Sequence, residues 1–466
     1  MSTPEVSTPE VSTVRTCQER PGATEAPTAP AQQGLWLLHQ VRPADASNHI
    51  CYTVDWPRPV HPAVLAGALG ELVARHEALR TIFPETRGEP RQVILPAQPV
   101  PLVVADLDPG DGLTVEQWAQ AEARQPFDLT GGPLLRASLV RRGERHTLVL
   151  SVHHIIFDAW SADVLVDELS ALCRARETGT DAGLAPLRAQ YADYARCQAD
   201  RLAGPALDRQ RAYWRAKLAA GQGPLPLPAD HPRDPRGGQA GATYRFLFPE
   251  RLRTAIDDLG RRRGATRFMV ALAGFQLLLH RWTGREDIAV GTAVTMRDRP
   301  EFEGLIGYCL NTLVLRADIT GAESFGELIG QVRDTVLDAF DHRDLPFELV
   351  VRELAPARSP GVMPLINVVF ALSSRGGGRK PGPAADGVVV REVDTGGSRV
   401  DLTLGLEEDA EAGELRGALE YDPGLFREAT IERLCGGLLR LLEAVAADPN
   451  LPVSLLLLPN LTSRTC

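Results

Sequence analysis

The chain has 466 residues, 44% of them hydrophobic and 24% charged, with a formal net charge of −10 at pH 7. These proportions are those of an ordinary globular protein, and the length predicts two units of about 200 residues each. The negative charge argues against a nucleic-acid partner held by bulk electrostatics, and the lack of an apolar run of about 18 residues argues against a membrane span.

The seven cysteines are irregularly spaced and form no C-x-x-C pair. The N-terminus lacks the charged start and the apolar stretch that mark a secretory signal. We therefore expect free thiols in a reducing compartment and a cytoplasmic location.

The first segment, residues 1–28, is rich in Pro and Thr and begins with a short direct repeat. This composition predicts a disordered tail, with folded structure starting near Ala31. A helix is predicted from Pro62, because the following apolar residues recur at helical spacing. These residues are Leu65, Leu69, Leu72 and Val73.

An apolar, β-branched run at residues 148–152 predicts a buried strand, and His153, His154 and Asp158 follow it directly. Imidazole titrates near neutrality, so a strand that ends in His-His-x-x-x-Asp is suited to bring a base into a cleft. Because successive strand residues point to opposite faces, one histidine should face the cleft while the other packs behind it. From the residues alone, a packing role is as well supported as a catalytic one. A zinc or iron site is a weaker alternative, since no second cluster of ligands appears.

A Gly- and Pro-rich stretch at residues 219–241 predicts a linker between an N-terminal lobe, 29–218, and a C-terminal lobe, 242–466. Both halves mix strands with helices, which predicts an α/β fold. In the second half, strands are expected near 242–248, 288–291, 365–372, 387–393, 400–406 and 415–421, and a long amphipathic helix at 428–447.

Seven separated segments, in order, are similar to motifs of the condensation domains of nonribosomal peptide synthetases, which belong to the chloramphenicol acetyltransferase-like superfamily. The resemblance covers about residues 31–460. Its leading motif is His153-His154-x-x-x-Asp158, followed by Trp160 and Ser161. The other six stretches are 31–36, 75–83, 191–194, 306–312, 342–348 and 364–367.

The resemblance implies two chloramphenicol acetyltransferase-like lobes that form a V-shaped pseudo-dimer with a tunnel between them. Within the catalytic motif it makes His154 the base and His153 its support. Asp158 is then a structural aspartate that forms an ion pair with Arg297 of the second lobe. The substrate-binding positions that it implies are Trp160, Ser161, Tyr308, Asn311 and Asn367, and the two asparagines are equally suited to brace the tunnel.

The resemblance also implies the reaction partners. A donor acyl group arrives as a thioester on the phosphopantetheine arm of a carrier protein, so no permanently bound cofactor and no metal are expected. No adenylation domain or carrier motif is seen, and we therefore expect a freestanding monomer that recruits a peptidyl carrier protein in trans. The acceptor is a small amine or alcohol, and the product is an amide or an ester.

Two residues depart from the family pattern. Ala159 stands where the family usually has Gly, and it would be strained if the position needed a positive φ. Cys309 stands where Phe is common, which would open space on the acceptor side. Both departures suggest an unusual substrate.

Three alternatives stay open. An epimerisation domain shares the His-His-x-x-x-Asp motif, although residues 306–312 and 342–348 match the condensation type better. An acyltransferase that uses coenzyme A would share the fold and the base. A degenerate domain that only docks carriers or partner enzymes would be no enzyme, and the retention of His154 argues against it.

Overall fold

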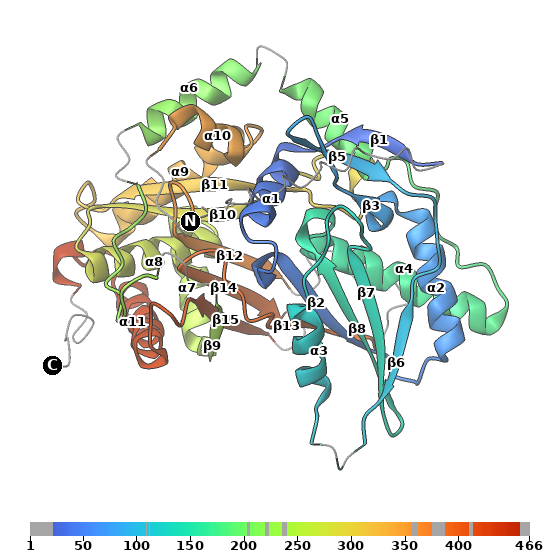
Figure 1. Ribbon diagram of the computed structural model, residues 1–466. Helices are drawn as coiled ribbons and strands as arrows, with labels where there is room; N and C mark the ends of the chain where they lie inside the picture. Colours follow the sequence, from blue (N-terminus) through green and yellow to red (C-terminus); the bar gives the residue numbers. More distant parts are fainter. Residues whose placement is uncertain are drawn as a thin grey trace, which may run out of the picture.

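The computed structural model describes residues 22–456, apart from several short gaps, and shows two large β-sheets that lie side by side with helices packed on them, and a smaller third sheet (Figure 1). The gaps are residues 109, 111, 203–205, 220–222, 235–239, 357–361, 375–386 and 410–412. The prediction of a two-lobed α/β fold is confirmed, each lobe having its own hydrophobic core.

The first lobe, on the right of Figure 1, is built on a five-stranded sheet in the order β13-β2-β8-β7-β6. Its strands are β2 (His49–Asp55), β6 (Leu102–Asp106), β7 (Leu135–Arg142), β8 (Arg145–His153) and β13 (Val389–Val393). Helices α2 (Pro62–Arg75) and α4 (Ala159–Thr178) share one core with Leu148 and Leu150 of β8, whereas α3 (Val115–Arg124) packs with Val149. Strand β8 is therefore buried on both faces, as its continuous apolar run predicts.

A smaller sheet joins β1 (Thr24–Pro27) to β5 (Glu89–Ile94), which also pairs with β3 (Thr81–Ile82) and β4 (Glu85–Thr86). Strand β1 lies inside the segment that we expected to be disordered. Its backbone pairs in antiparallel register with β5, and Ala26 is buried. Tertiary pairing thus orders a stretch whose local composition predicts disorder, while residues 1–21 of the expected tail lie outside the described part of the chain.

The second lobe is built on a six-stranded sheet in the order β11-β10-β12-β14-β15-β9. Its strands are β9 (Ala242–Leu247), β10 (Asp287–Thr295), β11 (Leu310–Asp318), β12 (Val368–Ser374), β14 (Leu402–Asp409) and β15 (Glu414–Tyr421). Its helices are α7 (Glu250–Arg263), α8 (Arg267–Thr283), α9 (Phe325–Asp341), α10 (Phe347–Leu354) and α11 (Glu428–Ala447). Leu402 and Leu404 point into the helix-packed core, whereas Thr403 and Gly405 alternate onto the other, less buried face.

The lobe boundaries differ from the sequence prediction in two places. Helix α6 (Ala206–Leu218) was expected in the first lobe, but its apolar residues Leu207 and Trp214 belong to the core of the second. Strand β13 was expected in the second lobe, but it crosses over and pairs with β2. Its buried Val393 packs with Cys51 of β2, so β13 is held on the first lobe by side-chain packing as well as by backbone hydrogen bonds.

The predicted linker is fastened to the second lobe along residues 223–234, the longest described part of it. Leu225 exchanges backbone hydrogen bonds with the side chain of Asn367, and the backbone N–H groups of Asp230 and His231 donate to the carbonyl of Leu425. These contacts make it a strap across the second lobe rather than a free connection. Residues 220–222 and 235–239 of the predicted linker lie outside the described part.

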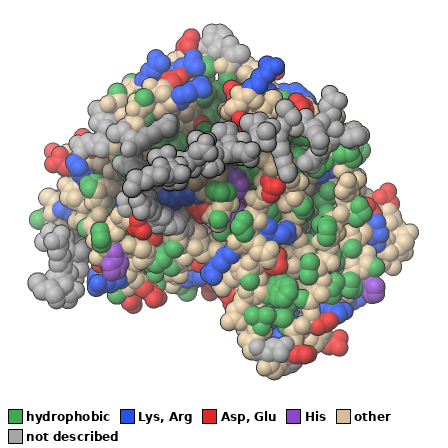
Figure 2. Space-filling view, in the orientation of Figure 1, with side chains coloured by type: hydrophobic (Ala, Val, Ile, Leu, Met, Phe, Trp, Pro, Cys, Tyr) green, Lys and Arg blue, Asp and Glu red, His purple; other side chains and the backbone are tan. Residues whose placement is uncertain are grey.

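The visible face of the molecule mixes acidic and basic side chains, and apolar side chains gather at its lower right, in the region of β6 (Figure 2). Val103 and Val104 of this edge strand are 51% and 40% exposed. None of the described helices combines the length and the apolar character that a membrane crossing needs.

Candidate active site

The two histidines of the leading motif lie where β8 ends, and they point to different environments. His153 is the last residue of β8, and His154 opens a short 3-10 turn that connects to α4. At the end of this connection Asp158, which caps α4, bonds to Arg297 and Cys309 of the second lobe. The different environments of the two histidines are the separation that the alternation of strand side chains predicts.

His153 is a buried packing residue. Its ring makes edge contacts with His39, His49 and Phe127 at centroid distances of 5.7, 5.8 and 6.0 Å. Its Nδ1 accepts a hydrogen bond of 3.1 Å from the backbone N–H of Ile155, which fixes the turn. Burial, followed by the neighbouring His49, lowers its pKa well below the ordinary value, so the ring is neutral.

His154 is held in a single tautomer. Its Nδ1 lies 2.5 Å from the carbonyl oxygen of Phe157, and because a carbonyl can only accept, Nδ1 must carry the hydrogen. The lone pair of the neutral ring is then on Nε2, and none of the described residues forms a hydrogen bond with that atom. Burial, followed by the positive charge of Arg399, lowers the pKa of His154 to about 3. The ring is therefore a neutral proton acceptor at pH 7.

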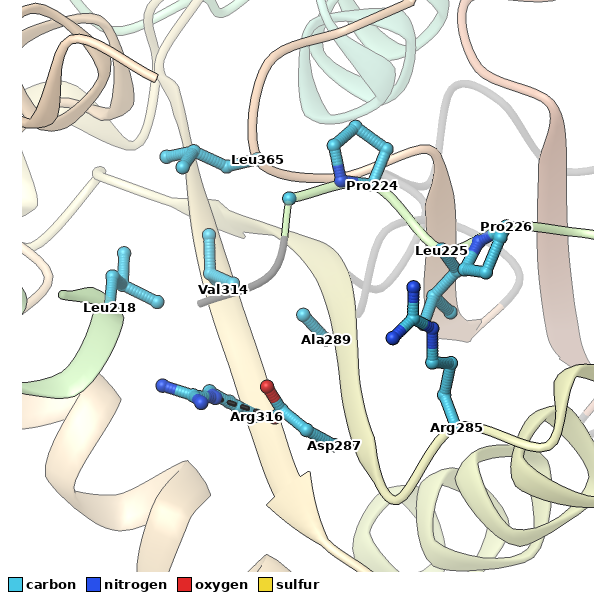
Figure 3. Close-up of a pocket in the computed structure, with 11 residues that line it drawn as sticks. Leu218, Pro224, Leu225, Pro226, Arg285, Asp287, Ala289, Val314, Arg316 and Leu365 are labelled. Carbon is cyan, nitrogen blue, oxygen red and sulfur yellow. Dashed lines mark hydrogen bonds and ion pairs between the residues drawn. The ribbon is translucent and has the colours of Figure 1, made fainter. Parts of the chain in front are cut away.

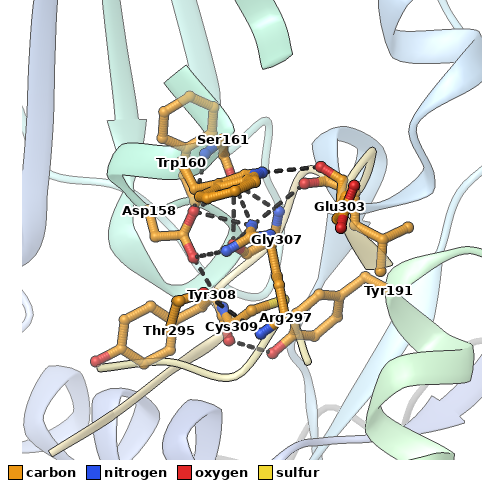
Figure 4. A network of polar contacts seen from close by, with 12 residues as sticks. Asp158, Trp160, Ser161, Tyr191, Thr295, Arg297, Glu303, Gly307, Tyr308 and Cys309 are labelled. Carbon is orange, nitrogen blue, oxygen red and sulfur yellow. Dashed lines mark hydrogen bonds and ion pairs between the residues drawn. The ribbon is translucent and has the colours of Figure 1, made fainter. Parts of the chain in front are cut away.

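Asp158 and Arg297 form a buried ion pair between the lobes (Figure 4). The guanidinium donates to both carboxylate oxygens at 2.6 and 3.0 Å, and both side chains are 0% exposed. Burial by itself would raise the pKa of Asp158, but the charge and hydrogen bonds of Arg297 outweigh it and the pKa is lowered. The same carboxylate caps α4 through the N–H of Ser161 and accepts the N–H of Cys309.

The residues around this pair complete the network rather than face an open site. Ser161 is fully buried and its hydroxyl contacts Asp158 and the backbone of Gly307. A Cβ at Gly307 would lie 2.0 Å from the ring of Tyr191, so only glycine fits there. Trp160 donates to the carbonyl of Glu303, with its ring centroid 5.8 Å from the Arg297 guanidinium carbon (Figure 4).

The two asparagines, for which the resemblance left substrate binding and bracing open, both hydrogen-bond to the backbone. Asn311 is 5% exposed, donates to the carbonyls of Arg343 and Leu345, and accepts the N–H of Phe347. Asn367 binds the Asp401 carboxylate as well as the strap. Polar atoms of Ser161, Asn311 and Asn367 are thus hydrogen-bonded to protein groups, and their role in substrate binding stays a prediction. Tyr308 is different, since its partly exposed ring lies 4.8 Å from the ring of His154.

Neither departure from the family pattern disturbs the site. Ala159 is the first residue of α4 and its side chain is exposed, so its backbone needs no glycine. Cys309 is fully buried in the second core, and burial raises its thiol pKa to about 12, which leaves it an unreactive neutral group. We expected Cys309 to open space on the acceptor side, but its side chain is fully buried.

The part of the chain that the structure describes contains no group of three His, Cys, Asp or Glu side chains placed to hold a metal ion. A pocket on the second sheet lies apart from the histidines, between the strap at Pro224 and Pro226 and the strands β10 and β11 (Figure 3). Its floor carries the Asp287–Arg316 ion pair. This pocket is therefore not part of the His154 site.

The structure adds three residues to the site that sequence reasoning left without a role. Gln32 donates to the carbonyl of Ile155, next to His154. Arg399 contributes, after burial, to the lowered pKa of His154. The pKa of Tyr308 is raised to about 12 by burial and by the charge of Glu348, while Arg399 opposes this rise. Gln32 and Glu348 belong to segments that match family motifs, and this match could have marked them as site residues. The sequence alone does not show what they contact.

Comparison with known proteins agrees with this geometry. A family model described as the condensation domain matches residues 23–464. The chain is 41% identical to phosphinothricin tripeptide synthetase PhsC of Streptomyces viridochromogenes, and 40% identical to a linear gramicidin synthase of Brevibacillus parabrevis. The matches cover 91% and 92% of this chain but only 39% and 8% of those relatives, which are much longer proteins.

Solved structures give the same result. The X-domain from teicoplanin biosynthesis has a TM-score of 0.82 at 28% identity and covers 94% of this chain and 98% of its own. SgcC5 of Streptomyces globisporus has a TM-score of 0.76 at 28% identity and covers 91% and 100%. The sequence match, the two-lobed fold and the His-His-x-x-x-Asp turn agree, and the chain belongs to the condensation-domain family of nonribosomal peptide synthetases.

Proposed function

We propose that this protein is a condensation enzyme that transfers an acyl or aminoacyl group from a carrier-protein thioester to an amine or alcohol acceptor. The observation that carries the proposal is the state of His154, a neutral ring with its Nδ1 hydrogen held by the Phe157 carbonyl. Its Nε2 is the one atom of the leading motif that is both basic and without a hydrogen bond from the described residues. The phosphopantetheine of the donor would arrive on the carrier protein.

The chemistry follows from that lone pair. The nucleophile adds to the thioester carbonyl, and its proton must leave as the tetrahedral intermediate forms. His154 Nε2 accepts this proton, and the thiolate leaves and is protonated in turn. A lowered pKa keeps the imidazole unprotonated across the physiological range, so the base is always in its active form, although a weak base gives a smaller driving force.

A docking role is the second candidate. The X-domain of teicoplanin biosynthesis, which is 28% identical to this chain at a TM-score of 0.83, is known as a complex with OxyB. A domain of this fold can therefore present a surface to another protein. The retained base and its fixed tautomer favour catalysis for this chain.

The test is reconstitution with aminoacyl-loaded carrier proteins and a panel of amines and alcohols, with the product followed by mass spectrometry. Transfer from the carrier thioester, and not from the matching acyl-coenzyme A, is the expected result. Efficient turnover of acyl-coenzyme A without carrier would favour the soluble-thioester acyltransferase. Carrier binding without turnover across the panel would favour the docking role. That the carrier belongs to a separate polypeptide stays a prediction.

A further inference from the structure

Helix α1 (Pro30–Val41) contacts both the His154 turn and the start of α10. Gln32 donates a hydrogen bond of 3.0 Å to the carbonyl of Ile155, the residue after His154. Two positions along the helix, a Cβ at Gly34 would lie 2.9 Å from Cγ and 3.0 Å from Oε1 of Glu348. The same helix therefore positions Glu348 and the turn that carries the proposed base.

A second set of contacts brings Glu348 toward the site from the other lobe. The N–H of Phe347, which opens α10, donates to the side chain of Asn311 at 3.0 Å. Asn311 follows Tyr308 by three residues, and the Tyr308 ring contacts His154. Burial and, more weakly, the charge of Glu348, the residue after Phe347, raise the pKa of the Tyr308 hydroxyl, so the carboxylate lies within electrostatic range of that ring.

The carboxylate of Glu348 lacks a counter-charge within the described structure. Its Oε2 is buried and makes no hydrogen bond to the described residues, and no Lys, Arg or His among them forms an ion pair with it. Burial raises its pKa, against a weaker effect of its own backbone N–H. An unpaired carboxylate is costly to enclose, and proteins normally give such a group a counter-charge or hydrogen-bond donors. The other acidic side chain at the site, Asp158, has both.

We propose that Glu348 is a specificity-determining residue that binds the amino group of the acceptor substrate, which arrives as an ammonium and releases one proton to solvent before the neutral amine attacks the thioester. The inference rests on the proposed function and deepens it, because it selects amines over alcohols as the acceptor class. An ammonium group supplies the hydrogen-bond donors and the charge that the enclosed carboxylate lacks, whereas an alcohol supplies a single neutral donor. The hydrogen bond from Phe347 to Asn311 fixes the start of α10, and the missing side chain of Gly34 leaves the space in which the Glu348 side chain lies.

The experiment compares acceptor kinetics for amino acid methyl esters and the matching 2-hydroxy acid methyl esters. In the Glu348→Gln variant, the KM for the amines should rise roughly 10- to 100-fold, as expected for losing one charge-assisted contact, while the KM for the hydroxy esters is unchanged. An equal change for both acceptor classes, or no change for either, overturns the proposal.

A second variant moves the carboxylate without removing it. Gly34→Ala places a methyl group against the flexible end of Glu348, and it should raise the KM for amines in the same direction while its helix is favoured rather than weakened. Gly70→Ala is the matched control, because Gly70 lies inside α2 with no described atom within 4 Å of the added methyl. An amine KM that stays at the wild-type value in Gly34→Ala contradicts the proposal.

Two measurements need no turnover. Binding of the amino acid methyl esters by calorimetry should be lost or much weakened in Glu348→Gln relative to wild type, and equal or absent binding in both proteins overturns the inference even if the enzyme proves active. Thermal stability distinguishes a substrate-binding role of Glu348 from a structural one. Because no ion pair of the described structure is lost, the Glu348→Gln variant should melt at a temperature no lower than wild type. A marked loss of stability would indicate a structural carboxylate. Failure of the proposed function would instead appear as wild-type protein that binds amines and transfers nothing.

Discussion

An imidazole fixed by one carbonyl oxygen has one tautomer, and at His154 this determines which nitrogen can act. The hydrogen bond from Nδ1 to Phe157 leaves Nε2 as the acceptor, and burial keeps the ring neutral. His153, one residue earlier, is equally buried, but its Nδ1 accepts a backbone N–H. The two adjacent residues therefore have opposite hydrogen-bonding patterns, and only His154 leaves its basic nitrogen without a partner in the described structure.

Arg399 offers a test of the electrostatics at this residue. Its positive charge disfavours the imidazolium, second only to burial in lowering the pKa of His154. Arg399→Gln should raise that pKa, so the protonated, inactive ring appears at higher pH. Below about pH 5, kcat/KM should fall for both proteins as the ring protonates, and the fall should begin at a higher pH in the variant than in wild type. Arg245→Gln is the control, because Arg245, like Arg399, acts on Glu392 but is not among the named causes of the lowered His154 pKa. Superimposable profiles would rule out this role of Arg399.

The sequence identifies the His-His-x-x-x-Asp motif but does not show what each of its residues contacts. The strand before His153 could be predicted because a buried strand has a local pattern, and the Asp158–Arg297 pair followed from the resemblance. The contacts of Gln32, Glu348 and Arg399 join segments more than a hundred residues apart or depend on enclosure. No local sequence pattern predicts such contacts, and none predicts which backbone groups Asn311 and Asn367 bind.

At the scale of elements, the helices and strands agree with their sequence patterns better than the lobe boundaries do. Helix α11 spans Glu428–Ala447, as its amphipathic period predicts. The periodicity of apolar residues predicts which face of a helix or strand is buried, but it does not predict which of the two hydrophobic cores that face packs against. This is why α6 and β13 were assigned to the wrong lobes. Both elements cross the expected boundary, in opposite directions.

Trp214 tests the assignment of α6. Its side chain is 2% exposed in the second core, and its indole N–H donates to the carbonyl of His342 at 2.8 Å. Trp214→Ala should lower the free energy of unfolding by about 3–5 kcal/mol, as for other large-to-small core changes. Arg209→Ala, an exposed position on the same helix, should change it by less than about 0.5 kcal/mol. Chemical denaturation measures both, and equal midpoints for the two variants would show that α6 does not pack as described.

At the scale of the whole molecule, the lobes are joined by the β13 exchange and by a buried charge pair. Asp158 belongs to the first lobe and Arg297 to the second, and Gly307 and Cys309 of the second lobe also bond to the Asp158–Ser161 corner. The pair therefore holds the His154 turn against the second lobe. The site combines His154 of the first lobe with Tyr308 of the second, so its geometry depends on the Asp158–Arg297 ion pair.

Removing half of that pair should damage folding more than chemistry. Asp158→Ala leaves the Arg297 guanidinium buried without its partner, and the free energy of unfolding should fall by about 3–5 kcal/mol. Arg141→Ala breaks the exposed ion pair with Asp106 and should have little effect. The double variant Asp158→Ala with Arg297→Leu should be less destabilised than the sum of the single changes, because it leaves no unpaired charge. An Asp158→Ala protein with normal thermal stability would contradict the structural role.

The central claim is that the Nε2 of His154 removes the acceptor's proton during transfer from a carrier-bound thioester. The most direct measurement is the single-turnover rate of that transfer with a loaded carrier protein, for wild type and for His154→Ala. The account predicts a rate about 10²- to 10⁴-fold lower in the variant, with carrier binding and thermal stability retained. Equal rates for the two proteins would contradict it.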